Sequence, residues 1–154
     1  MKCAAALLLV LSASPAFAGT FGGAWEGMIA FDRSNHPFDD TKTALTRIEV
    51  HGETVRVFAF EKGKAVEIMP GKFRLIEAGP GAVIFASNSQ DVFPHKGQAE
   101  TQTYTVARQG DGSLLVEYAR VGQVERDEIL SGTIATFGTR GEGVLKQLEA
   151  ARGQ

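Results

Sequence analysis

Apolar and polar residues alternate with a period of two along most of this chain. Over residues 25–32, one face carries Trp25, Gly27, Ile29 and Phe31, and the other carries Glu26, Met28, Ala30 and Asp32. This alternation is typical of a half-buried β-strand, because successive side chains of a strand point to opposite faces. We therefore predict nine strands, two of them short, at 25–32, 44–50, 54–60, 65–69, 72–77, 82–87, 101–108, 113–121 and 128–137.

Most connections between these predicted strands are short and contain turn residues, such as Gly52 and the pair Pro70-Gly71. Short connections favour antiparallel neighbours, since a parallel pair needs a crossover of about a dozen residues. A sequential series of such strands closes most simply as a barrel, which leaves no free edge. We therefore predict an all-β fold, an antiparallel up-and-down barrel of eight to nine strands. A two-sheet β-sandwich is the alternative.

The alternation changes near the end of the chain. The segment GTRGEG at 138–143 interrupts it and is interpreted as a connector. Residues 144–151 consist of helix formers, with Val144, Leu145 and Leu148 on one side. We predict a short C-terminal helix there. The chain contains no internal repeat and no linker, which favours a single domain.

The first 18 residues have the pattern of a secretion signal. Lys2 precedes an apolar run at 3–11, and Ala16-Phe17-Ala18 is an A-x-A cleavage site. The run is shorter than the roughly 20 residues that cross a bilayer, so we expect no membrane span. We predict cleavage between Ala18 and Gly19 and a periplasmic or secreted product. Cys3, the one cysteine of the chain, is then lost, which excludes a disulfide, a Cys metal site and a Cys nucleophile.

The motif Gly23-Ala24-Trp25 at the start of the first predicted strand, followed by the series of strands, resembles the lipocalin-like (calycin) group of small β-barrels. The T-D-Y-like stretch of true lipocalins is absent, so the resemblance is to the wider group. It implies that residues 19–154 form one lipocalin-like barrel domain. It also implies that Trp25 plugs the narrow end of the barrel, with a late basic residue, Arg140 or Arg120, packed over it.

Charge and motifs argue against several classes of function. The chain has 16 basic and 18 acidic residues, which are interspersed along it. Without a basic stripe, we expect no nucleic acid partner and no anionic membrane surface as a partner. There is no G-x-S-x-G elbow, no H-E-x-x-H motif and no phosphate-binding loop. We predict that the protein is not an enzyme and uses no cofactor.

Two predicted loops, 32–43 and 87–100, are longer than the others. They carry residues of the types that bind zinc, namely His36, Asp39, Asp40 and His95. If every segment between them is a separate strand, the two loops lie at opposite ends of the barrel. They reach the same end only if 65–69 and 72–77 form one bent strand. We therefore assign no metal ligand, and we expect His51, beside a turn, to face solvent.

The predicted inward face is apolar apart from two phenols. It comprises Trp25, Ile29, Phe31, Ile48, Val50, Phe73, Leu75, Val83, Phe85, Tyr104, Val106, Leu114, Val116, Tyr118, Leu130 and Ile134. The strand at 54–60 is ambiguous, because Val55 and Val57 oppose Phe58 and Phe60. A barrel of about eight strands either fills with side chains or holds one small ligand.

Two functions follow from this interior. One is an exported barrel that binds a small hydrophobic ligand, with the loop at 32–43 as its lid. The residues predicted to contact that ligand are Phe31, Phe38, Phe73, Phe85, Tyr104 and Tyr118. The alternative is a filled barrel that acts as a protein-interaction or inhibitor module of the cell envelope. The sequence names neither the ligand nor the partner.

Overall fold

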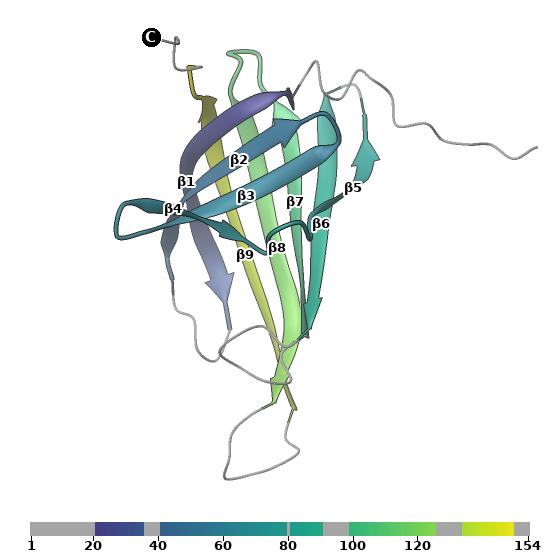
Figure 1. The fold of residues 1–154 in the computed structure, drawn as a ribbon. Helices are drawn as coiled ribbons and strands as arrows, with labels where there is room; N and C mark the ends of the chain where they lie inside the picture. Colours follow the sequence, from purple (N-terminus) through teal and green to yellow (C-terminus); the bar gives the residue numbers. More distant parts are fainter. Residues whose placement is uncertain (1–20, 36–40, 80, 91–98, 126–133, 150–154) are drawn as a thin grey trace, which may run out of the picture.

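Nine antiparallel strands form one curled sheet in the computed structural model, which describes residues 21–35, 41–79, 81–90, 99–125 and 134–149 (Figure 1). The predicted all-β antiparallel fold is therefore confirmed. The strands are β1 (Gly23–Ser34), β2 (Thr43–His51), β3 (Thr54–Glu61), β4 (Lys64–Ile68), β5 (Arg74–Ala78), β6 (Ala82–Gln90), β7 (Ala99–Arg108), β8 (Leu114–Glu125) and β9 (Ile134–Gln147).

The order of strands in the sheet is β4-β3-β2-β1-β9-β8-β7-β6-β5. Because β1 pairs with β9, this is the order of an up-and-down barrel that is open between β4 and β5. The sheet is thus a half-barrel with two edges, whereas the sequence favoured a closed barrel. Both edge strands have only five residues, and short edge strands limit pairing with other chains.

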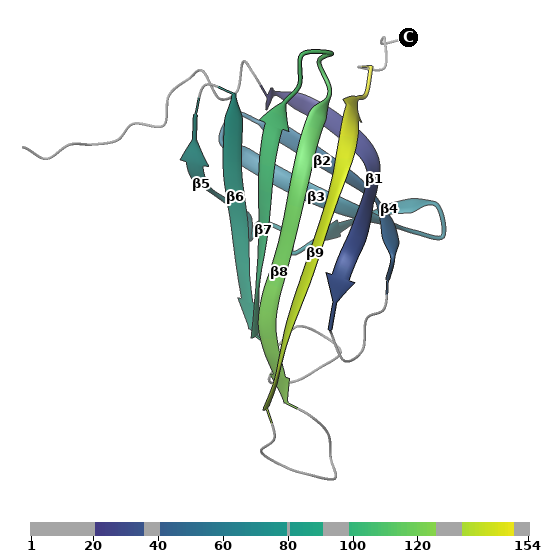
Figure 2. The same cartoon turned by 180° about the vertical axis from the view of Figure 1, so that it is seen from behind.

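The sheet curls so that β2, β3 and β4 cross in front of β6, β7 and β8 in Figure 1 and behind them in Figure 2. The core lies between these two halves. Within the described residues, every predicted inward side chain is buried or packed against this core. Leu130 lies outside the described residues, and the side chain of Ile134 is not described. On β3, Val55 and Val57 face the core, which resolves the ambiguity of that strand.

The chain crosses from one edge of the sheet to the other through residues 69–73. Phe73 turns into the core at 5 % exposure, and Met69 accepts a hydrogen bond at its sulfur from the Ser87 hydroxyl at 2.9 Å. Side chains of residues 69–73 therefore pack in the opening between β4 and β5, where a closed barrel would have a ladder of backbone hydrogen bonds. Among the described residues, no ladder joins β4 to β5.

The crossing also reverses the expected placement of the two long loops. Antiparallel pairing around the sheet requires β4 and β5 to point the same way, so they act as one interrupted strand. In register, Ser34 lies opposite Thr139, which lies opposite Arg120, and Ser87 follows at the same level. The ends of β1 and β6 therefore lie at the same end of the sheet. The expectation of opposite ends was wrong.

The predictions of a connector at 138–143 and of a helix at 144–151 were also wrong. Residues 138–147 belong to β9, and Leu148 and Glu149 follow it outside any helix. Leu145 is fully buried while Val144 is half exposed, as in a strand. Gly141 and Gly143 are needed in β9 because the backbone of β1 lies close to them. A Cβ on Gly141 would lie 2.6 Å from the Ala30 carbonyl oxygen, and one on Gly143 would collide with the carbonyl oxygen of Met28. Residues 150 and 151 lie outside the described part.

The described residues contain no helix that is both long enough and apolar enough to span a bilayer.

Candidate functional site

Five of the six residues predicted to contact a ligand lie in one continuous aromatic cluster. Phe85 stacks on Tyr104 with ring centroids 5.2 Å apart, and Phe73 meets both rings edge-on. Tyr118 lies 4.9 Å from Tyr104 and 5.6 Å from Phe31. Such contacts are favourable beyond the burial of area. The sixth residue, Phe38, lies outside the described residues.

A cavity of about 120 Å³ adjoins this aromatic cluster. Its walls come from both halves of the sheet, and they include Ile29, Phe31, Thr46, Ile68, Gln102, Tyr104 and Tyr118. Phe73 and Phe85 are not part of the walls and pack behind Tyr104. The predicted ligand residues therefore divide into three that line the cavity and two that support one of those three.

Next to the cavity, the inner face carries a charged pair that the sequence analysis did not identify. Glu100 is 4 % exposed, and its Oε2 accepts hydrogen bonds from Nε and Nη2 of Arg120 at 2.8 and 2.6 Å. Its Oε1 accepts one from Nε2 of Gln102 at 2.8 Å. A buried carboxylate is costly unless it is paired and hydrogen-bonded, and here it is both. This cluster gives a mainly apolar interior one charged side.

Gln102 links the charged pair to the cavity. It is 8 % exposed and forms part of the cavity wall. Its Oε1 is the one buried side-chain oxygen or nitrogen in the described residues that has no hydrogen-bond partner. Buried polar atoms in folded proteins nearly always have a partner, so this oxygen marks a place where a donor fits.

Tyr104 is the neighbouring inward residue on β7, two positions after Gln102. Burial raises the pKa of its hydroxyl well above the ordinary value. The hydroxyl therefore remains protonated at neutral pH, and it is able both to donate and to accept a hydrogen bond. It has no hydrogen-bond partner among the described residues, and its oxygen, unlike Gln102 Oε1, keeps some contact with solvent.

The missed residues could have been found from the alternation alone. Gln102 and Glu100 share the face of Tyr104 by period two, and Arg120 shares the face of Tyr118. The predicted strand begins at residue 101, after Glu100, and only its apolar and phenolic side chains were predicted to face inward. A polar residue in the inward register is the signal that identifies the charged pair.

At the opposite end of the sheet from the long loops, Trp25 is fully buried. Its indole Nε1 donates a hydrogen bond to the carbonyl oxygen of Phe21 at 3.0 Å. The basic residue over its ring is Arg108, whose guanidinium carbon lies 5.5 Å from the ring centroid. The two candidates named from the resemblance were wrong. Arg120 lies over Phe137 instead, and Arg140 is exposed.

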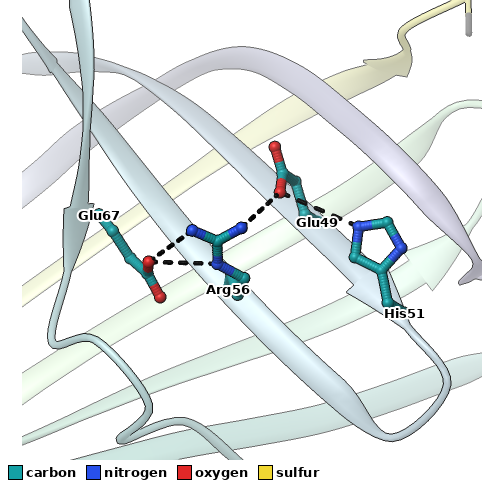
Figure 3. A network of polar contacts seen from close by, with 4 residues as sticks. All are labelled: Glu49, His51, Arg56 and Glu67. Carbon is teal, nitrogen blue, oxygen red and sulfur yellow. Dashed lines mark hydrogen bonds and ion pairs between the residues drawn. The ribbon is translucent and has the colours of Figure 1, made fainter.

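The outer face of β2, β3 and β4 carries a ladder of charged residues (Figure 3). Arg56 lies between Glu67 and Glu49, with nitrogen–oxygen distances of 2.7 and 3.4 Å. Its guanidinium also covers Phe58, at 4.8 Å from the ring centroid. His51 extends into solvent as expected, with Nε2 4.0 Å from Glu49. These contacts are those of a solvated strand surface.

No cluster of three or more His, Cys, Asp or Glu side chains suited to a metal occurs within the described ranges. The four residues weighed as zinc ligands, His36, Asp39, Asp40 and His95, lie outside those ranges, so that hypothesis is not tested.

Comparison of the chain with protein-family models, with curated proteins and with solved structures gave no match. The strand order is compatible with a calycin-like barrel, and the fold itself is an all-strand antiparallel half-barrel.

Proposed function

We propose that this protein is an exported, lipocalin-like half-barrel that binds a small, mainly apolar ligand in its interior. The observation that supports the proposal is the cavity of about 120 Å³ beside Phe31, Tyr104 and Tyr118. Buried apolar side chains, among them Trp25, Ile29 and Phe85, pack together in the core beside it. A space lined mostly by apolar groups in a packed core is a site that an apolar molecule fills favourably.

The size of the cavity limits the ligand. Sites for drug-sized molecules have volumes of about 300–1,000 Å³, whereas an apolar cavity of about 150 Å³ holds benzene. A cavity of about 120 Å³ therefore suits one ring or a short chain. Larger lipids, such as fatty acids, exceed the volume of this cavity.

The loop at 32–43 is proposed as the lid, with Phe38 as its apolar residue. Phe31 and Ala44, near the two ends of this loop, both line the cavity. The backbone N–H of Phe31 donates to the carbonyl oxygen of Lys42 at 2.8 Å, which holds the two ends together. A ligand entering at this end of the sheet would pass the loop.

Export remains part of the proposal. Cleavage between Ala18 and Gly19 leaves two residues before Phe21, whose side chain is buried against the core. Mass spectrometry of the protein isolated from a periplasmic fraction is expected to give a chain that begins at Gly19. A soluble product that begins at Met1 would contradict export.

Binding is tested by thermal unfolding with benzene, toluene and cyclohexane as probes. A ligand that binds only the folded state raises the melting temperature as its concentration rises. Ala59→Leu places a larger side chain in the cavity wall and is expected to abolish this shift. Ala65→Leu, the same change at an exposed position of β4, is the matched control and is expected to keep it.

If none of the probes shifts the melting temperature of the unaltered protein, ligand binding is wrong. The second candidate function, an interaction module of the cell envelope, would then be favoured. Its supporting observation is the pair of sheet edges, where Val66 on β4 is 41 % exposed and Ile76 on β5 is 65 % exposed. Exposed edges can accept a strand from a partner protein. A protein that co-purifies from the native host, and is released by Val66→Lys, would support this function.

A further inference from the structure

The orientation of the Gln102 amide is determined by its neighbours. Both oxygens of Glu100 act as acceptors, one from Arg120 and the other from the Gln102 amide nitrogen. If the amide were rotated by half a turn, two oxygens would face each other at a hydrogen-bond distance. The carbonyl oxygen of Gln102 is therefore the atom that remains without a donor.

None of the described residues donates a hydrogen bond to that oxygen. Arg120 is directed to Glu100, and Thr46 donates to the Ala44 carbonyl oxygen at 3.4 Å. Tyr104, on the same face of β7, lines the same cavity and has a hydroxyl without a partner in the described part. The cavity thus borders one acceptor and one donor that the described protein leaves unused.

We infer that the ligand is a small hydroxylated ring, of the phenol class, whose hydroxyl donates to Gln102 Oε1 and accepts from the Tyr104 hydroxyl. This inference rests on the proposed function and names the chemistry of that ligand. A single hydroxyl group satisfies both protein groups, because it is at once a donor and an acceptor. The remaining walls include Ile29, Phe31 and Ile68, which suit the ring.

Phenol and toluene are suitable probes because they differ in the free energy of transfer from water into an apolar cavity. Phenol is better solvated by water than toluene is, so a purely apolar cavity would bind phenol more weakly. If its hydroxyl makes both hydrogen bonds, this order is reversed. By isothermal titration calorimetry, phenol is expected to bind the unaltered protein at least about tenfold more tightly than toluene, since two hydrogen bonds are gained.

Tyr104→Phe removes only a hydroxyl and keeps the ring. It is expected to weaken phenol binding by about tenfold and to leave toluene binding within about twofold, as loss of one hydrogen bond predicts. Thr103→Val removes a hydroxyl from the adjacent residue of β7, which points to the other face, and is expected to change neither. Gln102→Leu provides a second variant, with its fold verified by circular dichroism, and is expected to act as Tyr104→Phe does.

The outcomes separate this inference from the function on which it rests. Equal binding of phenol and toluene, or a Tyr104→Phe variant that loses both equally, overturns the inference and leaves apolar ligand binding intact. Binding of neither probe overturns both. Measurable toluene binding together with tighter, Tyr104-dependent phenol binding supports both.

Discussion

The indole of Trp25 and the backbone carbonyl of Phe21 are joined by a hydrogen bond of 3.0 Å, and both side chains are fully buried. The bond satisfies the one polar atom of the indole, which would otherwise be unpaired in the core. It also fixes the segment before β1 against the end of the sheet.

Trp25→Ala is expected to cost about 3–5 kcal/mol of the free energy of unfolding, as for other fully buried aromatic residues. Urea denaturation measures this loss. Because the chain has one Trp, fluorescence reports on this site alone, and the emission should be blue-shifted and resist quenching by iodide. Red-shifted emission together with little loss of stability would place Trp25 at the surface.

Gly143→Ala is expected to destabilise the fold by at least about 2 kcal/mol, because the new Cβ collides with the backbone of β1. Backbone atoms paired in a sheet cannot move aside as a flexible side chain does. Gly110→Ala is the control, since a Cβ there meets no atom within 4 Å, and it should stay within about 0.5 kcal/mol. Thermal unfolding of the two variants gives the comparison. Equal stability of both would show that β1 and β9 are not so closely packed.

The strands and the inward face could be predicted from the sequence because both depend on local alternation. The glycines of β9 could not be interpreted in this way. Gly141 and Gly143 are required by the close approach of β1, a strand more than one hundred residues earlier in the chain. Because glycine is depleted in strands, a prediction from the local sequence alone interprets a glycine-rich stretch as a connector. The formation of the last strand therefore depends on long-range packing, which a local pattern does not reveal.

The apolar half of the candidate site was predicted from the sequence, whereas the pairing of its charged residues could not be. Tyr104, Tyr118 and Phe31 stand out as inward aromatic residues, whereas Glu100 has a side chain that is seldom buried alone. It is buried here because Arg120, from the neighbouring strand, pairs with it. No pattern within one strand reveals such a partner. The register of the two strands brings them together, and that register is a property of the folded sheet.

Arg56→Gln is expected to raise the pKa of Glu67 towards its ordinary value, because the Arg56 hydrogen bond is the main cause that holds this pKa down. A carboxyl whose pKa is lowered on folding stabilises the fold at neutral pH and loses this contribution as the pH falls through the lowered pKa. The unaltered protein and the variant should therefore converge in stability in acid. Carboxyl ¹³C shifts measured against pH give the pKa directly. Asp111, whose pKa is lowered by Ser113, is the internal control and should not change.

Arg120→Met tests the buried charged pair. Methionine keeps an apolar chain near Phe137 but removes the two donors to Glu100, so a buried carboxylate loses its charge partner. Breaking one side of a buried pair typically costs about 3–5 kcal/mol, and a loss of this size is expected in urea denaturation at neutral pH.

The double variant Glu100→Gln with Arg120→Met should recover part of that loss, because a neutral amide is cheaper to bury than an unpaired carboxylate. Gln102 can still donate to the new amide oxygen, at the place where it now donates to Glu100 Oε1. The coupling between the two positions is then read from the double-mutant cycle. If the losses of the two single variants simply add, Glu100 and Arg120 do not depend on each other. The polar side of the cavity would then be held in place by its other contacts.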